Sequence, residues 1–115
     1  MAEGDPPPLE GPPWQAVEVL GQPVPAGIQV TFAIDAAGQA SGNAGCNGWG
    51  GRAIRSGDAL KFGPIRATRM ACEAERMAVE ADFLSALAQV TAVGGDDSGA
   101  LLLLADGAVV AVLRR

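Results

Sequence analysis

Two cysteines are the residues of this sequence with the most distinctive chemistry. Cys46 lies in the glycine-rich stretch SGNAGCNGWGG (residues 41–51), and Cys72 ends the stretch FGPIRATRMAC (residues 62–72). The pair could form a structural disulfide, remain as two buried thiols, or act as a redox couple activated by the start of a helix. The surrounding glycines favour the disulfide, because they let the backbone bend until the two cysteines meet. Cross-linking positions 26 residues apart would stabilise the fold by about 3.5 kcal/mol.

The sequence contains no histidine. Ser–His–Asp and Cys–His catalytic sites are therefore excluded, because imidazole is the base in both. A zinc ion would have only the two cysteines and carboxylates as ligands, which falls short of the usual sets. Asp96 and Asp97 could bind a cation, but such a pair in a glycine-rich stretch is typical of a solvated turn. We therefore expect no catalytic residue, no metal and no cofactor.

Charge and hydropathy exclude further classes of function. The 13 acidic and 8 basic residues give a net charge of −5, and no dense basic block is present. A nucleic-acid partner is therefore not expected. The most apolar stretch, residues 100–113, is interrupted by Asp106-Gly107 and is too short to span a bilayer. With 115 residues, 49% of them hydrophobic, the chain should form one domain with a real core.

The first 13 residues differ in composition from the rest. They contain five prolines and two glycines, which predicts an extended, poorly ordered leader before a single domain over residues 14–115. They lack the basic and apolar regions of a signal peptide. We therefore expect either a cytoplasmic protein or the mature part of an exported one.

Alternating apolar and polar residues predict that most of the domain is β-structure. In residues 28–35, the apolar side chains of Ile28, Val30, Phe32 and Ile34 fall on one face, which suits an antiparallel sheet with one wet side. Gly57-Asp58 and Asp106-Gly107 predict tight hairpins. The predicted strands cover residues 14–20, 28–35, 51–56, 59–64, 91–93, 100–105 and 108–114.

One amphipathic helix is predicted, over residues 73–90. Its apolar stripe contains Met77, Ala81, Leu84 and Ala88, widened by Phe83 and Leu87. Strands, one helix and then more strands indicate an α+β fold. We predict a mostly antiparallel, strongly curved and partly open barrel-like sheet, with the helix inserted before the C-terminal strands.

The two cysteine stretches and the helix together carry a family resemblance. The order SGNAGCN, FGPIRATRMAC and ERMAVEADFLSALAQV resembles the META domain, the family that includes the HslJ-type heat-inducible proteins of bacterial envelopes. The resemblance extends from about residue 14 to the last strand. The matching residues are Gly42, Gly45, Cys46, Asn47, Gly63, Pro64, Thr68, Met70, Ala71, Cys72, Glu80, Phe83, Leu84 and Leu87.

The resemblance implies a barrel-like antiparallel sheet with one helix, usually in an exported or lipid-anchored bacterial protein. It also implies links to stress response and no established reaction. The chain departs from the family at Gly48-Trp49-Gly50-Gly51, where polar residues often follow the GCN sequence. No role of that polar pattern is therefore carried over to this chain.

We expect a non-catalytic domain of the cell envelope, in the periplasm or at the outer membrane, that binds a partner protein or a small apolar ligand. It should be a monomer with no membrane-spanning segment. If both cysteines were reduced, a cytoplasmic location would fit better. The alternatives are a thiol redox protein and a structural scaffold. The expected binding surface consists of Asn43, Asn47, Trp49, Arg66 and Arg69.

Overall fold

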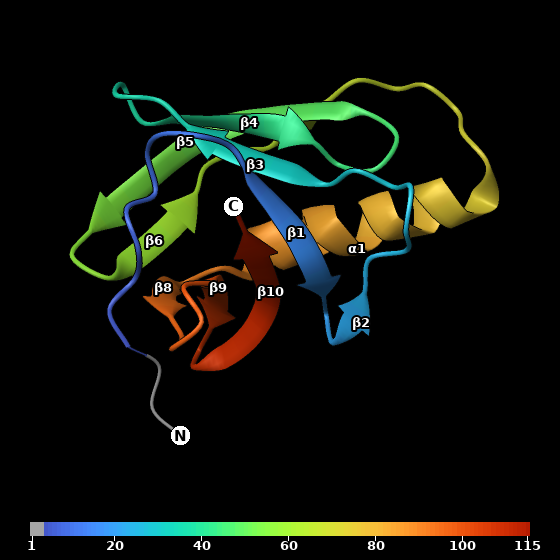
Figure 1. The fold of residues 1–115 in the computed structure, drawn as a ribbon. Helices are drawn as coiled ribbons and strands as arrows, with labels where there is room; N and C mark the ends of the chain where they lie inside the picture. Colours follow the sequence, from blue (N-terminus) through green and yellow to red (C-terminus); the bar gives the residue numbers. More distant parts are fainter. Residues whose placement is uncertain (1–3) are drawn as a thin grey trace.

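A curved sheet and one helix make up residues 4–115, the part of the chain that the computed structural model describes (Figure 1). All of the strand pairings are antiparallel, and the single helix follows β7. The elements are β1 (Trp14–Val19), β2 (Gln22–Pro23), β3 (Thr31–Ile34), β4 (Gln39–Asn43), β5 (Gly48–Ser56), β6 (Ala59–Phe62), β7 (Arg66–Ala67), α1 (Ala74–Gln89), β8 (Ala92–Gly95), β9 (Leu101–Ala105) and β10 (Ala108–Arg114).

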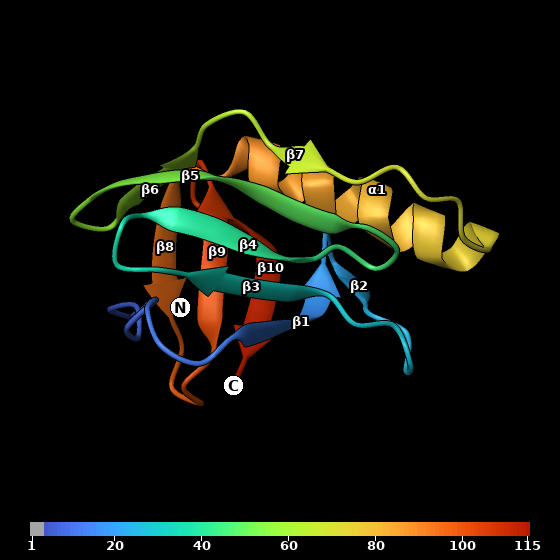
Figure 2. The same ribbon diagram turned by 90° about the horizontal axis from the view of Figure 1, so that it is seen from above.

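The sheet closes on itself. Its strand order is β10-β9-β8-β6-β5-β4-β3-β1-β2, and β10 also pairs with β1, which makes the sheet a ring. The join between β6 and β8 is short, with one register pair, Ala59 opposite Ala92. Figure 2 shows β3, β4 and β5 crossing over β8, β9 and β10, with α1 along one side. The predicted α+β fold is therefore confirmed, although the ring is not a regular barrel.

Both predicted hairpins are present. β5 and β6 flank the turn at residues 57–58, and β9 and β10 flank Asp106-Gly107. Asp106 and Gly107 have φ angles of 49° and 88°, the left-handed values that favour Asp-Gly in a tight hairpin. The four predicted inward residues of the stretch 28–35 are all buried, although β3 itself begins only at Thr31.

The helix covers the predicted residues but buries a different face. Its buried residues are Glu80, Phe83, Ala86 and Leu87. The prediction of a Met77–Ala81–Leu84–Ala88 stripe was wrong, since Leu84 is only partly buried and the other three are exposed. Phe83 and Leu87 lie one turn apart and have large apolar surfaces. Their burial in the ring therefore determines how the helix is rotated.

Aromatic side chains fill the space inside the ring. The Trp49 ring lies 6.2 Å from that of Phe32, 6.3 Å from that of Phe62 and 5.8 Å from that of Phe83, measured between centroids. Phe83 comes from α1 and the other three come from the sheet, so the cluster fixes the helix against the strands. Such stacked and edge-to-face pairs add stability beyond the area they bury.

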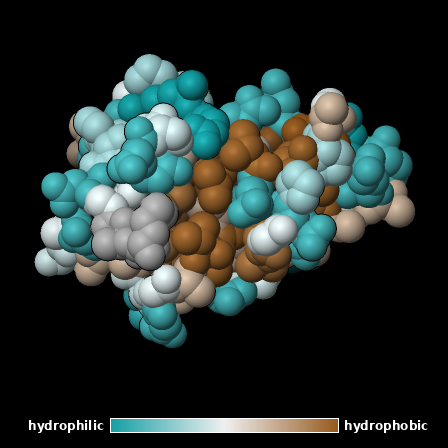
Figure 3. All heavy atoms as spheres, turned by 60° about the horizontal axis from the view of Figure 1, so that its bottom comes forward, coloured by the Kyte–Doolittle hydropathy of each residue, from teal (hydrophilic) through white to brown (hydrophobic). Residues whose placement is uncertain are grey.

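The four consecutive leucines of β9 divide between the two faces of the sheet. Leu101 and Leu103 belong to the main core, whereas Leu102 and Leu104 pack outside it with Ala100. Figure 3 shows hydrophobic side chains gathered over this part of the molecule. Because successive side chains of a strand point to opposite faces, these leucines make both faces of β9 apolar.

The proline-rich leader is packed along its described part. Leu9 is fully buried, and the Gly4 amide donates to the Gly95 carbonyl at 2.7 Å. The Arg115 guanidinium donates to the carbonyls of Leu9, Glu10 and Pro12 and lies 4.1 Å from the Trp14 ring centroid. One cation thus binds several carbonyls of residues 4–13 and holds this part of the leader against the domain. Residues 1–3 of the leader lie outside the described part.

Candidate functional site

The two cysteines form a disulfide between the β4–β5 connection and the segment before α1. Their Cα atoms are 6.0 Å apart. The interpretation of Cys46 and Cys72 as two free buried thiols is therefore wrong. Gly45 precedes the first cysteine with a φ of +118°, and a Cβ atom there would lie 3.3 Å from the Arg76 carbonyl oxygen. The glycine thus lets the connection turn tightly against the helix.

Asn47, the residue after the first cysteine, has a side chain with every hydrogen-bonding position filled. Its Nδ2 donates to Glu80 Oε2 at 2.9 Å and to the Met70 carbonyl at 3.1 Å. Its Oδ1 accepts from the Met70 amide at 2.7 Å and from Thr68 Oγ1 at 3.0 Å. An asparagine amide offers two donors and two acceptor lone pairs, so this environment matches its full capacity.

Glu80 receives the other half of this network. Its Oε1 accepts from the backbone amide of Asn47 at 2.6 Å, while Oε2 accepts from the side chain of the same residue. Only 8% of Glu80 and 1% of Asn47 are exposed. A carboxylate at this depth is tolerated because both oxygens have donors.

The network connects the three stretches on which the family resemblance depends. Residues 41–51 contribute Asn47, residues 62–72 contribute Thr68 and the Met70 backbone, and the helix contributes Glu80. The disulfide joins the first two stretches only a few residues away. These motif residues therefore hold the loop before the helix in place.

The sequence contained one signal for Glu80 that our prediction did not use. Glu80, Phe83 and Leu87 follow the i, i+3, i+7 spacing of one helix face, so burial of the two apolar residues implies burial of the acid. A lone acidic residue on a buried face needs a hydrogen-bond donor, and asparagine is a candidate. Which asparagine donates depends on the tertiary fold.

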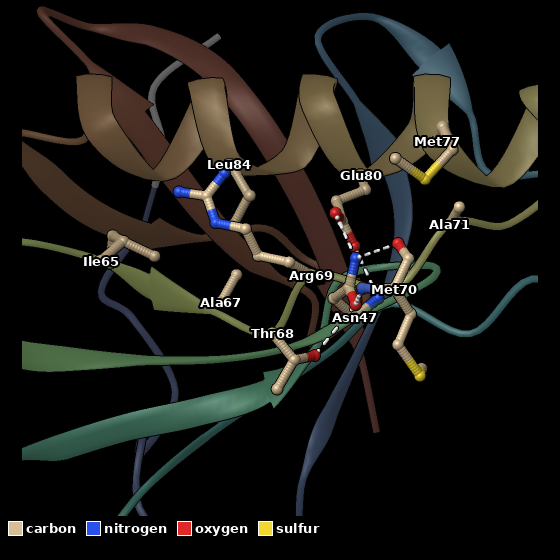
Figure 4. Close-up of a pocket in the computed structure, with 10 residues that line it drawn as sticks. All are labelled: Asn47, Ile65, Ala67, Thr68, Arg69, Met70, Ala71, Met77, Glu80 and Leu84. Atoms are coloured by element: carbon tan, nitrogen blue, oxygen red, sulfur yellow. Dashed lines mark hydrogen bonds between the residues drawn. The ribbon is translucent and has the colours of Figure 1, made fainter.

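A groove lies between α1 and the extended segment that contains β7. Figure 4 shows the Asn47–Glu80 network at its floor, under the helix. Its volume is about 450 Å³, within the roughly 300–1,000 Å³ range of small-ligand sites. The lining residues are Asn47, Ile65, Ala67, Thr68, Arg69, Met70, Ala71, Met77, Glu80 and Leu84.

Apolar side chains and one cation border this groove. Met70 is 60% exposed and Met77 38% exposed, so Met77 lies at the groove and not in the core where the helical stripe placed it. The Arg69 side chain extends across the groove towards Leu84 (Figure 4). Within residues 4–115, the Arg69 guanidinium forms no ion pair and no hydrogen bond.

The structure divides the predicted binding surface among several places. Asn47 and Arg69 both line the groove, whereas Asn43 borders a polar depression of about 740 Å³ beside the disulfide. Arg66 lies on a shallow surface over β4 and β5. Trp49 is mainly a core residue, and its indole Nε1 donates to the Thr31 carbonyl at 3.1 Å. The five residues therefore line three depressions, with Trp49 beside Arg66 at the third.

The predicted turn at the other end of the molecule is a hydrogen-bonded one. Asp96 Oδ1 accepts from Ser98 Oγ at 2.7 Å, from the Ser98 amide at 2.9 Å and from the Ala100 amide at 3.1 Å. The bond from the Ser98 hydroxyl is the main cause that lowers the pKa of Asp96. Across residues 4–115, acidic and cysteine side chains form no cluster of three or more that could hold a metal ion. Nor does this part of the chain contain a helix of the length and hydropathy needed to cross a membrane.

These features define a class of small α+β domain in which a disulfide and an Asn–Glu network hold a loop across one helix. The chain belongs to the META domain family, whose model matches residues 7–115. It is also similar to a structure described as the NMR structure of the protein from Burkholderia xenovorans. That similarity has a TM-score of 0.71 at 26% identity and covers all of this chain and 92% of the other. Comparison with curated proteins found no match.

Proposed function

We propose that this META domain is a non-catalytic binding module of the cell envelope, and that the groove between β7 and α1 is its ligand site. The observation that carries the proposal is a pair of exposed methionines beside a groove that also contains an uncompensated arginine. Exposed apolar groups at a concave site are typical of binding surfaces. The ligand should combine an apolar part with an anionic group.

Met70 gives the clearest reason to place binding here. The fold uses the backbone amide and carbonyl of this residue, which bond to Asn47, and any residue type except proline could supply them. The side chain is left exposed at the groove. Methionine is flexible and polarisable, so it adapts to the shape of an apolar ligand.

The charge distribution supports an anionic group on the ligand. Residues 52–72 contain five basic side chains and one acidic one, a net charge of +4, although the whole chain has −5. Arg69 comes from this basic segment and lies in the groove. An anionic ligand would therefore be attracted to the groove and repelled by most of the remaining surface.

A binding role without catalysis fits the chemistry of the groove floor. The two polar side chains there, Asn47 and Glu80, bond to each other and to the loop backbone. Each Glu80 oxygen accepts one of these bonds, and the chain has no histidine to act as a base. The disulfide supports a location outside the cytoplasm, because such bonds persist in oxidising compartments.

The test uses 8-anilinonaphthalene-1-sulfonate, a probe with an apolar ring system and one negative charge. We expect the probe to shift the backbone amide signals of residues 65–71 and 77–84 in an NMR titration. Arg69→Ala should weaken its binding roughly two- to fivefold, the size of a partly exposed ion pair. Arg66→Ala removes the same charge from the same segment but outside the groove, and should change binding little.

Two results would overturn this proposal. One is a set of shifted signals confined to other parts of the molecule, such as the depression beside the disulfide. The other is an equal loss of affinity in the Arg66 and Arg69 variants, which would indicate general charge attraction rather than a site.

A further inference from the structure

Strand β7 has an edge that the sheet does not use. It pairs with β5 alone, with Ala67 opposite Trp49 and Arg66 opposite Gly50. On the other side of this segment lies the groove, and beyond the groove lies α1. A strand with one unpaired edge is a template for pairing with another extended chain.

The hydrogen-bond pattern shows which backbone groups point to that edge. The Thr68 amide donates to the Gly48 carbonyl at 3.0 Å. Thr68 and Gly48 are therefore a hydrogen-bonded pair of the antiparallel ladder between this segment and β5. Such pairs alternate with non-hydrogen-bonded ones in an antiparallel ladder. The amide and carbonyl of Ala67 therefore point away from β5, towards the groove.

The residues on either side of Ala67 extend this edge. Ile65 and Arg69 have the same alternation as Ala67, and all three side chains line the groove. Residues 4–115 form no hydrogen bond to the backbone amide or carbonyl of Ile65 or Arg69. β7 itself has two residues, and the backbone groups of Ile65, Ala67 and Arg69 are thus left without partners beside the groove.

We infer that the ligand of this groove is an extended peptide segment of a partner protein, which adds to β7 as a further strand. This inference depends on the proposed function, since it names the class of ligand that the same groove binds. Main-chain bonds to Ala67 would supply affinity, and alternate apolar side chains would pack on Leu84, Met70 and Met77. An acidic side chain of the peptide would pair with Arg69 at the rim, because Glu80 makes the floor unfavourable for a second anion.

Amide hydrogen exchange with a model peptide tests the inference without altering the protein. The probe is an acetylated, amidated heptapeptide in which three valines and one glutamate occupy the alternate positions that face the groove, with threonines between them. At saturation, we expect exchange of the Ala67 and Arg69 amides to slow at least tenfold. The Thr68 amide should change little, because it already donates to Gly48. A ligand that merely fills the groove would not produce this alternation.

Two N-methylated peptides provide the matched control. One carries N-methyl groups on the four residues that face the groove and the other carries them on the threonines, so only one of the two blocks the edge that faces β7. We expect one peptide to lose at least tenfold in affinity and the other to bind within about threefold of the parent.

The outcomes separate this inference from the proposed function. If the naphthalene sulfonate binds in the groove but the peptide does not, the peptide inference is wrong and the binding site stands. Equal affinity of both methylated peptides and the parent would also refute strand addition, because side chains alone would then account for binding. If neither probe binds in the groove, both proposals fail.

Discussion

Replacing Asn47 by alanine should destabilise this domain more than any other single loss of a polar side chain. The substitution removes four hydrogen bonds at once and leaves their partners in place. Those partners are Glu80 Oε2, the Met70 amide and carbonyl, and the Thr68 hydroxyl. The effect therefore depends on which of them water can reach.

The magnitude follows from the burial of each partner. Glu80 is 8% exposed, and a bond lost from a buried carboxylate costs about 2 kcal/mol. The Met70 amide adds about 1 kcal/mol, while the Thr68 hydroxyl and the Met70 carbonyl lie at the groove and can bond to water. The expected loss is about 3 kcal/mol, a large part of the roughly 5–15 kcal/mol that stabilises a small domain.

Urea unfolding monitored by tryptophan fluorescence measures this loss. With a denaturant slope of about 2 kcal/mol/M, the midpoint should fall by about 1.5 M. Asn43→Ala is the control, because Asn43 is exposed and makes one local bond, to the Gly45 amide. A change below about 0.5 kcal/mol for Asn47→Ala, or equal changes in both variants, would refute the central role that we assign to the network.

Three further predictions concern other parts of the molecule. The double variant Cys46→Ser, Cys72→Ser should lose about 3.5 kcal/mol of unfolding free energy, and mass spectrometry of the unmodified protein should show two hydrogens fewer than the reduced form. Gly42→Ala should lower the melting temperature strongly, because its Cβ would collide with a β3 carbonyl, whereas Gly48→Ala has ordinary contacts and should be nearly neutral. Because folding lowers the pKa of Asp96, its stabilising contribution should be present above the unfolded pKa of about 3.9 and disappear as the pH falls through the folded value. Asp96→Asn should therefore match the natural protein in acid and be less stable near neutral pH, as thermal unfolding across the pH range would show.

Local features of the fold were predictable from the sequence because local chemistry determines them. Asp106-Gly107 is one case, since the left-handed conformation of the turn favours those two residue types. The inward face of residues 28–35 is another, because side chains alternate along an extended chain wherever it packs. The curved, barrel-like sheet was predicted from the order of the strands and the helix, and the family resemblance implied the same arrangement.

The candidate site was only partly predictable, because it depends on contacts between distant segments. Asn47 and Arg69 were expected at a surface, but nothing local indicates that Glu80 accepts bonds from a residue 33 positions away. The rotation of the helix is decided by Phe83 inside the ring, so the apolar stripe read from periodicity placed Met77 in the core instead of the groove.

The arrangement separates the residues that build the site from those that would select its ligand. The disulfide, Asn47 and Glu80 fix the backbone of the loop before α1, and their bonds leave them few ways to contact anything else. The fixed backbone in turn presents the edge at Ala67 and the side chain of Arg69. The side chains of Arg69, Met70 and Met77 could therefore change, and the ligand preference with them, without breaking the network.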